Sequence, residues 1–206
     1  MGYLEFREQW FPLGCFSMNE VRAWRRNFDR TSVTRWVSKG YLVRLRQGWY
    51  AFGELLKEAE FSRYIAYKMC QPSYISLHCA LSFYGIIPEA VTQVTSVTTK
   101  RTTSYSNAFG DYTYQSVKPE LFYGYRQYGL QRGGSYLLAE PEKAIVDLLY
   151  LYPQYESEED MRELRFDEWW MSEELDKERL RRYVEQSGVK SLEKRVEVLL
   201  KSYGIK

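Results

Sequence analysis

Histidine and cysteine are scarce in this sequence of 206 residues, which has one histidine and three cysteines. A metal site that uses two histidines is therefore excluded. His78 could pair with its neighbour Cys79, but adjacent positions on a helix point about 100° apart, which makes Cys79 a poor partner. The cysteines form no Cys-x-x-Cys pair, so we expect reduced and partly buried thiols. We accordingly predict no catalytic residue, no bound metal and no cofactor.

Long apolar runs are also missing. No window approaches the ~18 consecutive apolar residues that a membrane-spanning helix needs. The first residues show no basic segment followed by an apolar core, so no signal peptide is visible. No glycine-rich phosphate-binding loop is present either. We therefore expect a cytoplasmic protein that has no membrane partner and is not an enzyme.

Aromatic residues, by contrast, make up 17% of the chain, and 19 of them are tyrosines. Tyrosine favours β-structure. Several tyrosines between positions 105 and 136 could form a platform on which nucleic-acid bases stack. Because residues 54–150 carry no net charge, we favour a packed sheet with aromatic residues on one face.

Charge is distributed unevenly along the chain. Residues 1–53 hold 9 basic and 4 acidic side chains, whereas residues 151–206 hold 11 basic and 14 acidic ones. The net charge of the whole chain is only +2. A basic head on a neutral to acidic body indicates that one end of the protein meets a polyanion.

The first 53 residues predict three helices followed by a hairpin. Ser17 and Glu20 have the spacing of a capping box, and we expect the second helix to run to about residue 28. Asp29 is a good N-cap for a third helix over residues 30–39, which Gly40 ends. Residues 41–45 and 48–52 read as two strands joined by a tight turn.

The remainder of the chain predicts a second unit. Helices are expected over residues 58–69 and 76–84, and strands over residues 91–99, 112–117, 122–130 and 135–139. Pro141 suits the first turn of a further helix. Two amphipathic helices follow in a tail that begins near residue 152, the last with an apolar stripe from Leu192 to Tyr203. The fold class is therefore α+β, with a mixed or antiparallel sheet flanked by helices.

The third helix carries the sharpest functional signal. At about 100° per residue, Val33, Trp36 and Val37 form one buried face. The opposite side carries hydroxyls and cations, which suit the major groove of DNA. Arginines on the preceding helix and on the hairpin could contact phosphates. The predicted DNA-binding residues are Thr31, Ser32, Arg35, Ser38, Lys39, Arg44, Arg46, Arg22, Arg25 and Arg26.

Three motifs follow one another along the chain: residues 16–50, which end in KGYLVRLRQGWY, residues 74–85 (YISLHCALSFYG) and residues 138–149 (LAEPEKAIVDLL). Together they resemble the AbiEi-type antitoxins of abortive-infection toxin–antitoxin systems. Their order and spacing are preserved, and the resemblance covers roughly residues 10–150. It implies an N-terminal winged helix-turn-helix, residues 1–53, that represses the protein's own operon. It also implies that residues 54–206 counteract a nucleotidyltransferase-like toxin, typically without a stable complex.

The sequence therefore predicts a DNA-binding, autoregulatory antitoxin whose partners are double-stranded operator DNA and that toxin. Two alternatives stay open. One is a stand-alone transcriptional regulator whose second domain senses a ligand or mediates oligomerisation. The other is a protein-interaction module with a degenerate winged helix, which would show no salt-dependent affinity for DNA.

Overall fold

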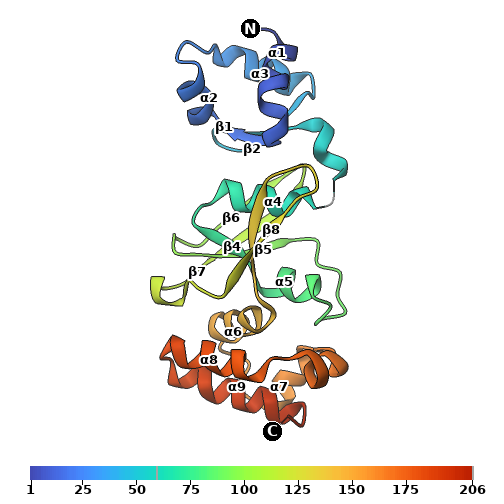
Figure 1. Ribbon diagram of the computed structural model, residues 1–206, viewed down its shortest axis with the longest axis vertical. Coiled ribbons are helices and arrows are strands. Elements are labelled where there is room, and N and C mark those ends of the chain that lie inside the picture. Colours follow the sequence, from blue (N-terminus) through green and yellow to red (C-terminus); the bar gives the residue numbers. More distant parts are fainter. Residues whose placement is uncertain (59, 206) are drawn as a thin grey trace.

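The computed structural model describes residues 1–58 and 60–205. The fold is α+β and contains a three-stranded antiparallel sheet and a six-stranded mixed sheet. Figure 1 shows three layers stacked along the long axis, with the two chain ends at opposite extremes. We call them the N-terminal unit (residues 1–58), the sheet unit (60–139) and the helical layer (140–205).

The N-terminal unit alternates helices with short strands. Its elements are α1 (Tyr3–Trp10), β1 (Cys15–Ser17), α2 (Met18–Trp24), α3 (Arg30–Ser38), β2 (Leu42–Arg46) and β3 (Trp49–Phe52), after which a 3-10 helix spans Gly53–Lys57. The strand order is β1-β3-β2. The expected hairpin is confirmed, whereas strand β1 was not expected from the sequence. Ser17 ends β1 opposite Trp49, and its side chain then caps α2.

Capping residues determine where the helices α2 and α3 of this unit begin. The capping box is confirmed, because the Glu20 amide donates to the Ser17 hydroxyl at 3.2 Å and the Ser17 amide donates to the Glu20 carboxylate at 2.6 Å. Asp29 is the N-cap of α3, and Gly40 follows the helix with a φ of 73°. The second helix is shorter than expected and ends at Trp24. The chain then turns so that Phe28 packs against Phe6, with ring centroids 5.5 Å apart.

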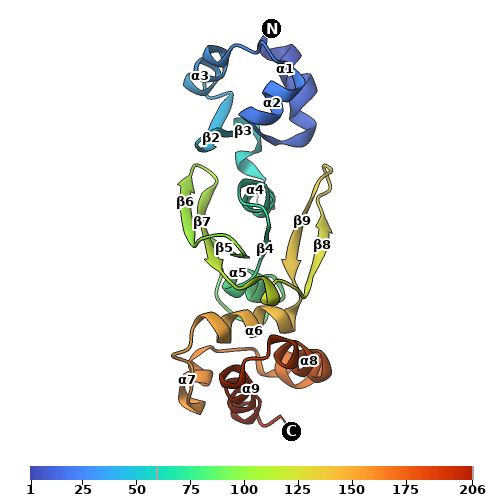
Figure 2. The same cartoon turned by 90° about the vertical axis from the view of Figure 1, so that its left-hand side faces the viewer.

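The six-stranded sheet has the order β6-β7-β5-β4-β9-β8. Its strands are β4 (Ser73–Ile75), β5 (Val94–Thr98), β6 (Thr103–Asn107), β7 (Gly110–Ser116), β8 (Tyr125–Gly129) and β9 (Ser135–Ala139), with helices α4 (Phe61–Met69) and α5 (Leu77–Phe83). The pairs β5–β7 and β4–β9 are parallel and the others antiparallel. Figure 2 shows the β6–β7 and β8–β9 hairpins diverging on either side of α4.

The helical layer contains α6 (Pro141–Leu151), α7 (Glu158–Glu163), a π-helical turn (Trp170–Glu174), α8 (Lys177–Ser187) and α9 (Lys190–Ser202). Pro141 occupies the first turn of α6 as expected. The tail after residue 152 has three helices rather than the expected two. The apolar stripe of α9 is buried at Leu192, Val196, Leu199 and Leu200, which packs this helix onto the rest of the layer.

Candidate nucleic-acid interface

Helix α3 exposes a polar face and buries an apolar one. Val33 and Trp36 are buried and Val37 is half-buried, as the periodicity predicts. On the other side, four of the predicted contact residues are exposed: Thr31, Arg35, Ser38 and Lys39. Trp36 anchors the helix, because its ring lies 4.8 Å from that of Phe6 and 6.1 Å from that of Phe28.

Hydroxyl groups on α3 are partly engaged inside the helix. The Thr31 hydroxyl donates to the Asp29 carboxylate, which also accepts from the Thr31 amide at 2.9 Å. These bonds lower the pKa of Asp29, so the cap stays ionised near neutral pH. The Ser38 hydroxyl donates to the Thr34 carbonyl oxygen at 3.1 Å. Each oxygen keeps acceptor capacity, while the cations Arg35 and Lys39 supply the donors of this face.

Ser32 lies elsewhere than the sequence predicts. It was placed at the flank of the polar face, but it is only 7% exposed. Its hydroxyl accepts a long hydrogen bond from the Arg35 guanidinium at 3.4 Å. Ser32 therefore has little surface to offer a ligand and lies beside Arg35, which is exposed.

The arginines of the preceding helix are exposed. Arg22, Arg25 and Arg26 all lie at the protein surface. Arg25 donates to the Glu5 carboxylate of α1 at 3.3 Å and forms an exposed ion pair with it. Because exposed ion pairs are weak, Glu5 competes only weakly with other anions for Arg25. Arg22 and Arg26 make no ion pair among the described residues, which leaves their guanidinium groups available to an external anion.

A basic hollow of about 330 Å³ joins α2, α3 and the hairpin. Arg22, Arg30 and Arg46 line it, together with the turn residues Gln47 and Gly48. The structure thus brings together arginines that are up to 24 positions apart in the sequence. Arg30 was not among the predicted site residues. The i, i+4 spacing that relates Arg30 to Thr34 and Ser38 was the signal that could have identified it.

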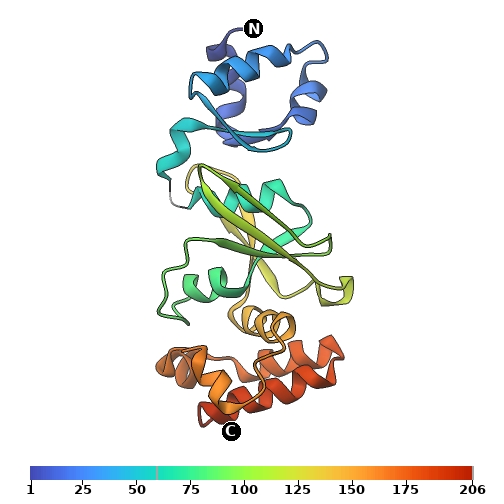
Figure 3. The same ribbon diagram turned by 180° about the vertical axis from the view of Figure 1, so that it is seen from behind.

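The hairpin faces the sheet unit rather than open solvent, as Figure 3 shows. Arg46 donates two hydrogen bonds to the main-chain oxygen of Met69, at 3.0 and 2.6 Å. The Asn107 amide donates to the Leu45 oxygen at 3.2 Å. Two of the three guanidinium nitrogens of Arg46 are thus engaged inside the protein, while its side chain also lines the basic hollow, and its predicted phosphate contact stays a prediction. Arg44, on the same strand, is exposed as expected.

The electrostatic balance of this surface is strongly positive. Residues 21–53 contain eight basic side chains and one acidic side chain, the Asp29 cap. A surface of this kind attracts polyanions and draws them in at long range. The exposed arginines and Lys39 extend from α2 across α3 and form one continuous basic stretch of the sequence.

No protein-family model matches the chain, and a search of curated proteins finds no matching relative. Among the described residues, no helix is long and apolar enough to cross a membrane.

A buried ionic cluster lies between the six-stranded sheet and the first two turns of α6. The Lys143 ammonium forms an ion pair with Asp147 and donates to the Tyr74 hydroxyl at 3.0 Å. Asp147 also accepts from Tyr74 at 2.9 Å and from Ser76 at 2.7 Å. Burial and the Asp147 carboxylate raise the pKa of Tyr74 well above its usual range, so its hydroxyl keeps its proton.

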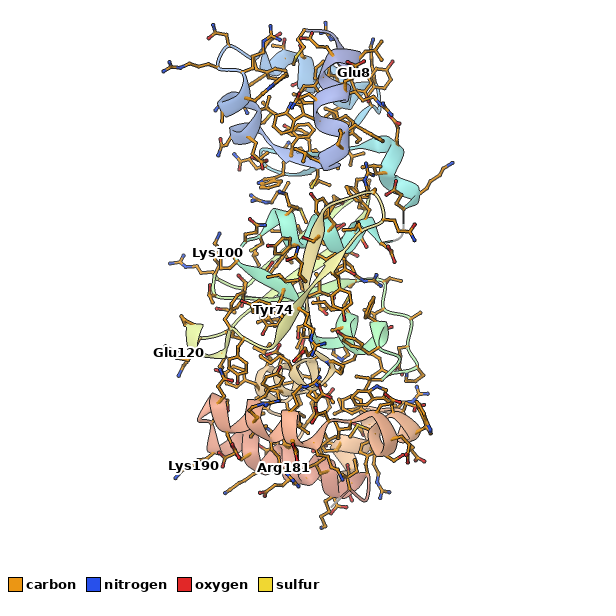
Figure 4. The ribbon with its side chains drawn as sticks, in the orientation of Figure 1. Glu8, Tyr74, Lys100, Glu120, Arg181 and Lys190 are labelled. Carbon is orange, nitrogen blue, oxygen red and sulfur yellow. The ribbon has the colours of Figure 1, made fainter. Side chains whose placement is uncertain are left out.

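This cluster was not predicted, although Lys143 and Asp147 lie within one of the quoted segments. Lys143 is fully buried and Asp147 is 2% exposed, so neither reaches solvent. Tyr74, labelled in Figure 4, belongs to strand β4, and the cluster therefore ties α6 to the middle of the sheet. The i, i+4 spacing of a cation and an anion on an otherwise apolar helix was the available signal.

Proposed function

We propose that the N-terminal unit is a winged helix-turn-helix that binds duplex DNA. The observation that carries this proposal is the outer face of α3, which exposes Arg35 and Lys39 beside the basic hollow at Arg22 and Arg30. The element order supports it as well, because helix, strand, two helices and a hairpin form a sheet of order β1-β3-β2. That order is typical of winged helices.

In this proposal, α3 enters the major groove. Arg35 donates two hydrogen bonds to a guanine edge, and Thr31 and Ser38 accept or donate at the groove wall. Arg22 and Arg30 hold a backbone phosphate in the hollow, while Arg26 and Arg44 add further phosphate contacts. The hairpin-turn residues Gln47 and Gly48 border this phosphate site, while Arg46 is bonded to the sheet unit.

We further propose that the protein is an autoregulatory antitoxin. The support is the resemblance of residues 16–50, 74–85 and 138–149 to the AbiEi-type antitoxins. On this proposal the DNA-binding unit represses the protein's own operon. Residues 54–206 counteract a nucleotidyltransferase-like toxin without a stable complex, and no step of the proposal requires catalysis by this chain.

The DNA-binding proposal is tested with the full-length protein and fluorescent duplexes. One duplex comes from the region upstream of the gene, and a second has random sequence. We expect Arg35→Ala to cost about 1–3 kcal/mol on the upstream duplex and little on the random one. Lys190→Ala is the matched control, because this exposed cation lies in the helical layer at the other end of the molecule (Figure 4). Equal losses on both duplexes would mean that Arg35 does not read bases.

The antitoxin proposal is tested by protection of cells. The proposal expects a nucleotidyltransferase-like gene beside this one, and that gene would be expressed together with the full-length protein. A variant with Arg22, Arg30, Arg35 and Lys39 all changed to Ala should lose operator binding and still protect. Loss of protection in this folded variant would place neutralisation in the N-terminal unit and contradict the division at residue 53.

A further inference from the structure

A cavity of about 400 Å³ opens at the junction of the sheet unit and the helical layer. It lies between α5, α6, the loop that follows α5 and the segment around α7. Pockets that bind small molecules usually measure about 300–1,000 Å³. The basic surface of the N-terminal unit contributes no residue to it, so the cavity is a site distinct from the proposed DNA-binding face.

The walls of the cavity combine apolar and polar side chains. Leu81, Leu148 and Phe166 form its buried floor, whereas Val91 and Tyr155 are half-buried and present apolar surface to it. The polar lining residues are His78, Glu89, Gln93, Glu163 and Thr95, and the Thr95 hydroxyl is already engaged, since it donates to the Ser76 carbonyl oxygen at 2.7 Å. A ligand that fills the cavity therefore presents an apolar body to these walls.

Charge at the cavity has a single sign. Glu89 and Glu163 line it, and no lysine or arginine is among its lining residues in the described part of the chain. Glu163 is exposed and makes no ion pair among the described residues, whereas Glu89 pairs with Arg165 at 2.9 Å. His78 also lines the cavity. Burial lowers the pKa of His78, which keeps the imidazole neutral near pH 7.

Backbone strain is concentrated around the cavity. Among the described residues, two that are not glycine have a positive φ: Leu77 at 56° and Arg165 at 52°. Leu77 directly precedes His78, which lines the cavity. Arg165 stands between Leu164 and Phe166, which also line it. Such conformations are costly for bulky side chains and cluster at ligand-binding and active sites.

Two contacts fix the strained segment to the opposite wall. The Asp167 amide donates to the Ile86 carbonyl oxygen at 2.7 Å, and the Arg165–Glu89 ion pair bridges the same two segments. The cavity is therefore held open by the fold rather than left as a gap between mobile segments.

We propose that this cavity binds a small organic cation, a protonated amine attached to a flat apolar body. The apolar body lies against the half-buried side chains of Val91 and Tyr155. The ammonium group faces Glu163, with neutral His78 as a further hydrogen-bond partner.

Tryptamine and 3-(indol-3-yl)propanoate test this proposal, because they share an indole body and carry opposite charges. Isothermal titration of the full-length protein should give saturable binding of tryptamine, with a Kd of about 0.1–1 mM for a ligand of this size. The propanoate should bind at least about tenfold more weakly. No saturation by tryptamine up to about 10 mM, or equal binding of both probes, would overturn the proposal.

Two variants locate the binding. Glu163→Gln should weaken tryptamine binding by about threefold to tenfold, since it removes the unpaired carboxylate at an exposed position. Glu159→Gln is the matched control, because Glu159 is exposed on the same helix and does not line the cavity. Val91→Trp should fill the cavity and abolish binding. Equal effects of Glu163→Gln and Glu159→Gln, or full binding by Val91→Trp, would place tryptamine elsewhere and overturn the proposal.

Discussion

The guanidinium of Arg46 donates two hydrogen bonds, of 3.0 and 2.6 Å, to the main-chain oxygen of Met69 at the end of α4. It also lies over two aromatic rings, 5.4 Å from the centroid of Trp49 and 5.6 Å from that of Tyr105. One arginine thereby joins the hairpin of the N-terminal unit to a helix and a strand of the sheet unit. The hairpin therefore packs against the sheet unit, and Arg46 links the two units through these contacts.

Arg46→Ala should therefore destabilise the protein more than Arg44→Ala. Hydrogen bonds from a charged donor contribute about 1.5–3 kcal/mol, and the cost should fall in that range. Arg44 is the control because it lies on the same strand and is exposed. The free energy of unfolding is measured by urea denaturation. Equal destabilisation by the two variants would show that the bonds to Met69 contribute nothing.

Trp36→Ala should unfold the small core of the N-terminal unit. Trp36 is 3% exposed and contacts the rings of Phe6, Phe28 and Tyr3. Removing a buried tryptophan costs about 3–5 kcal/mol. Trp24→Ala, at a position that is 42% exposed, should cost much less. Thermal unfolding followed by circular dichroism measures both, and an unchanged melting temperature for Trp36→Ala would contradict the packing described for α3.

The buried pair of Lys143 and Asp147 should show strong coupling. Lys143→Met leaves a buried carboxylate without its cation, which costs about 3–5 kcal/mol. Asp147→Leu leaves a buried ammonium and should cost as much. The double variant removes both charges, so it should be clearly less destabilised than the sum of the two single variants. Additive costs in urea denaturation would show that the two charges do not stabilise each other.

Features set by neighbouring residues could be predicted from the sequence. The capping box at Ser17, the Asp29 cap and the end of α3 at Gly40 each depend on a few adjacent positions, and the structure contains all three. The α+β class follows from the same local patterns. The prediction of which α3 residues are buried and which are exposed was also correct, apart from Ser32. It depends only on the helical period of about 3.6 residues.

Features that depend on distant partners could not be predicted. Strand β1 exists because Cys15–Ser17 pairs with the hairpin more than thirty positions away. Strand β6 lies at the sheet edge and has the polar sequence TSYSN, which carries no apolar signal. The position of Arg46 depends on Met69, and the burial of Lys143 depends on Tyr74. In each case the deciding contact comes from a residue that is not a near neighbour in the helix or strand concerned, and for Arg46 and Lys143 it comes from another layer of the fold.

The salt dependence of DNA binding tests the central claim most directly. Binding of the full-length protein to duplex DNA should weaken steeply as salt rises, because each phosphate contact releases a condensed counterion. With Arg22, Arg26, Arg30 and Arg44 on about four phosphates, a plot of log affinity against log salt concentration should have a slope of about −3 to −4. Changing these four arginines to Ala should bring the slope close to zero. A slope near zero for the unaltered protein would contradict the assignment of the N-terminal unit as a DNA-binding domain.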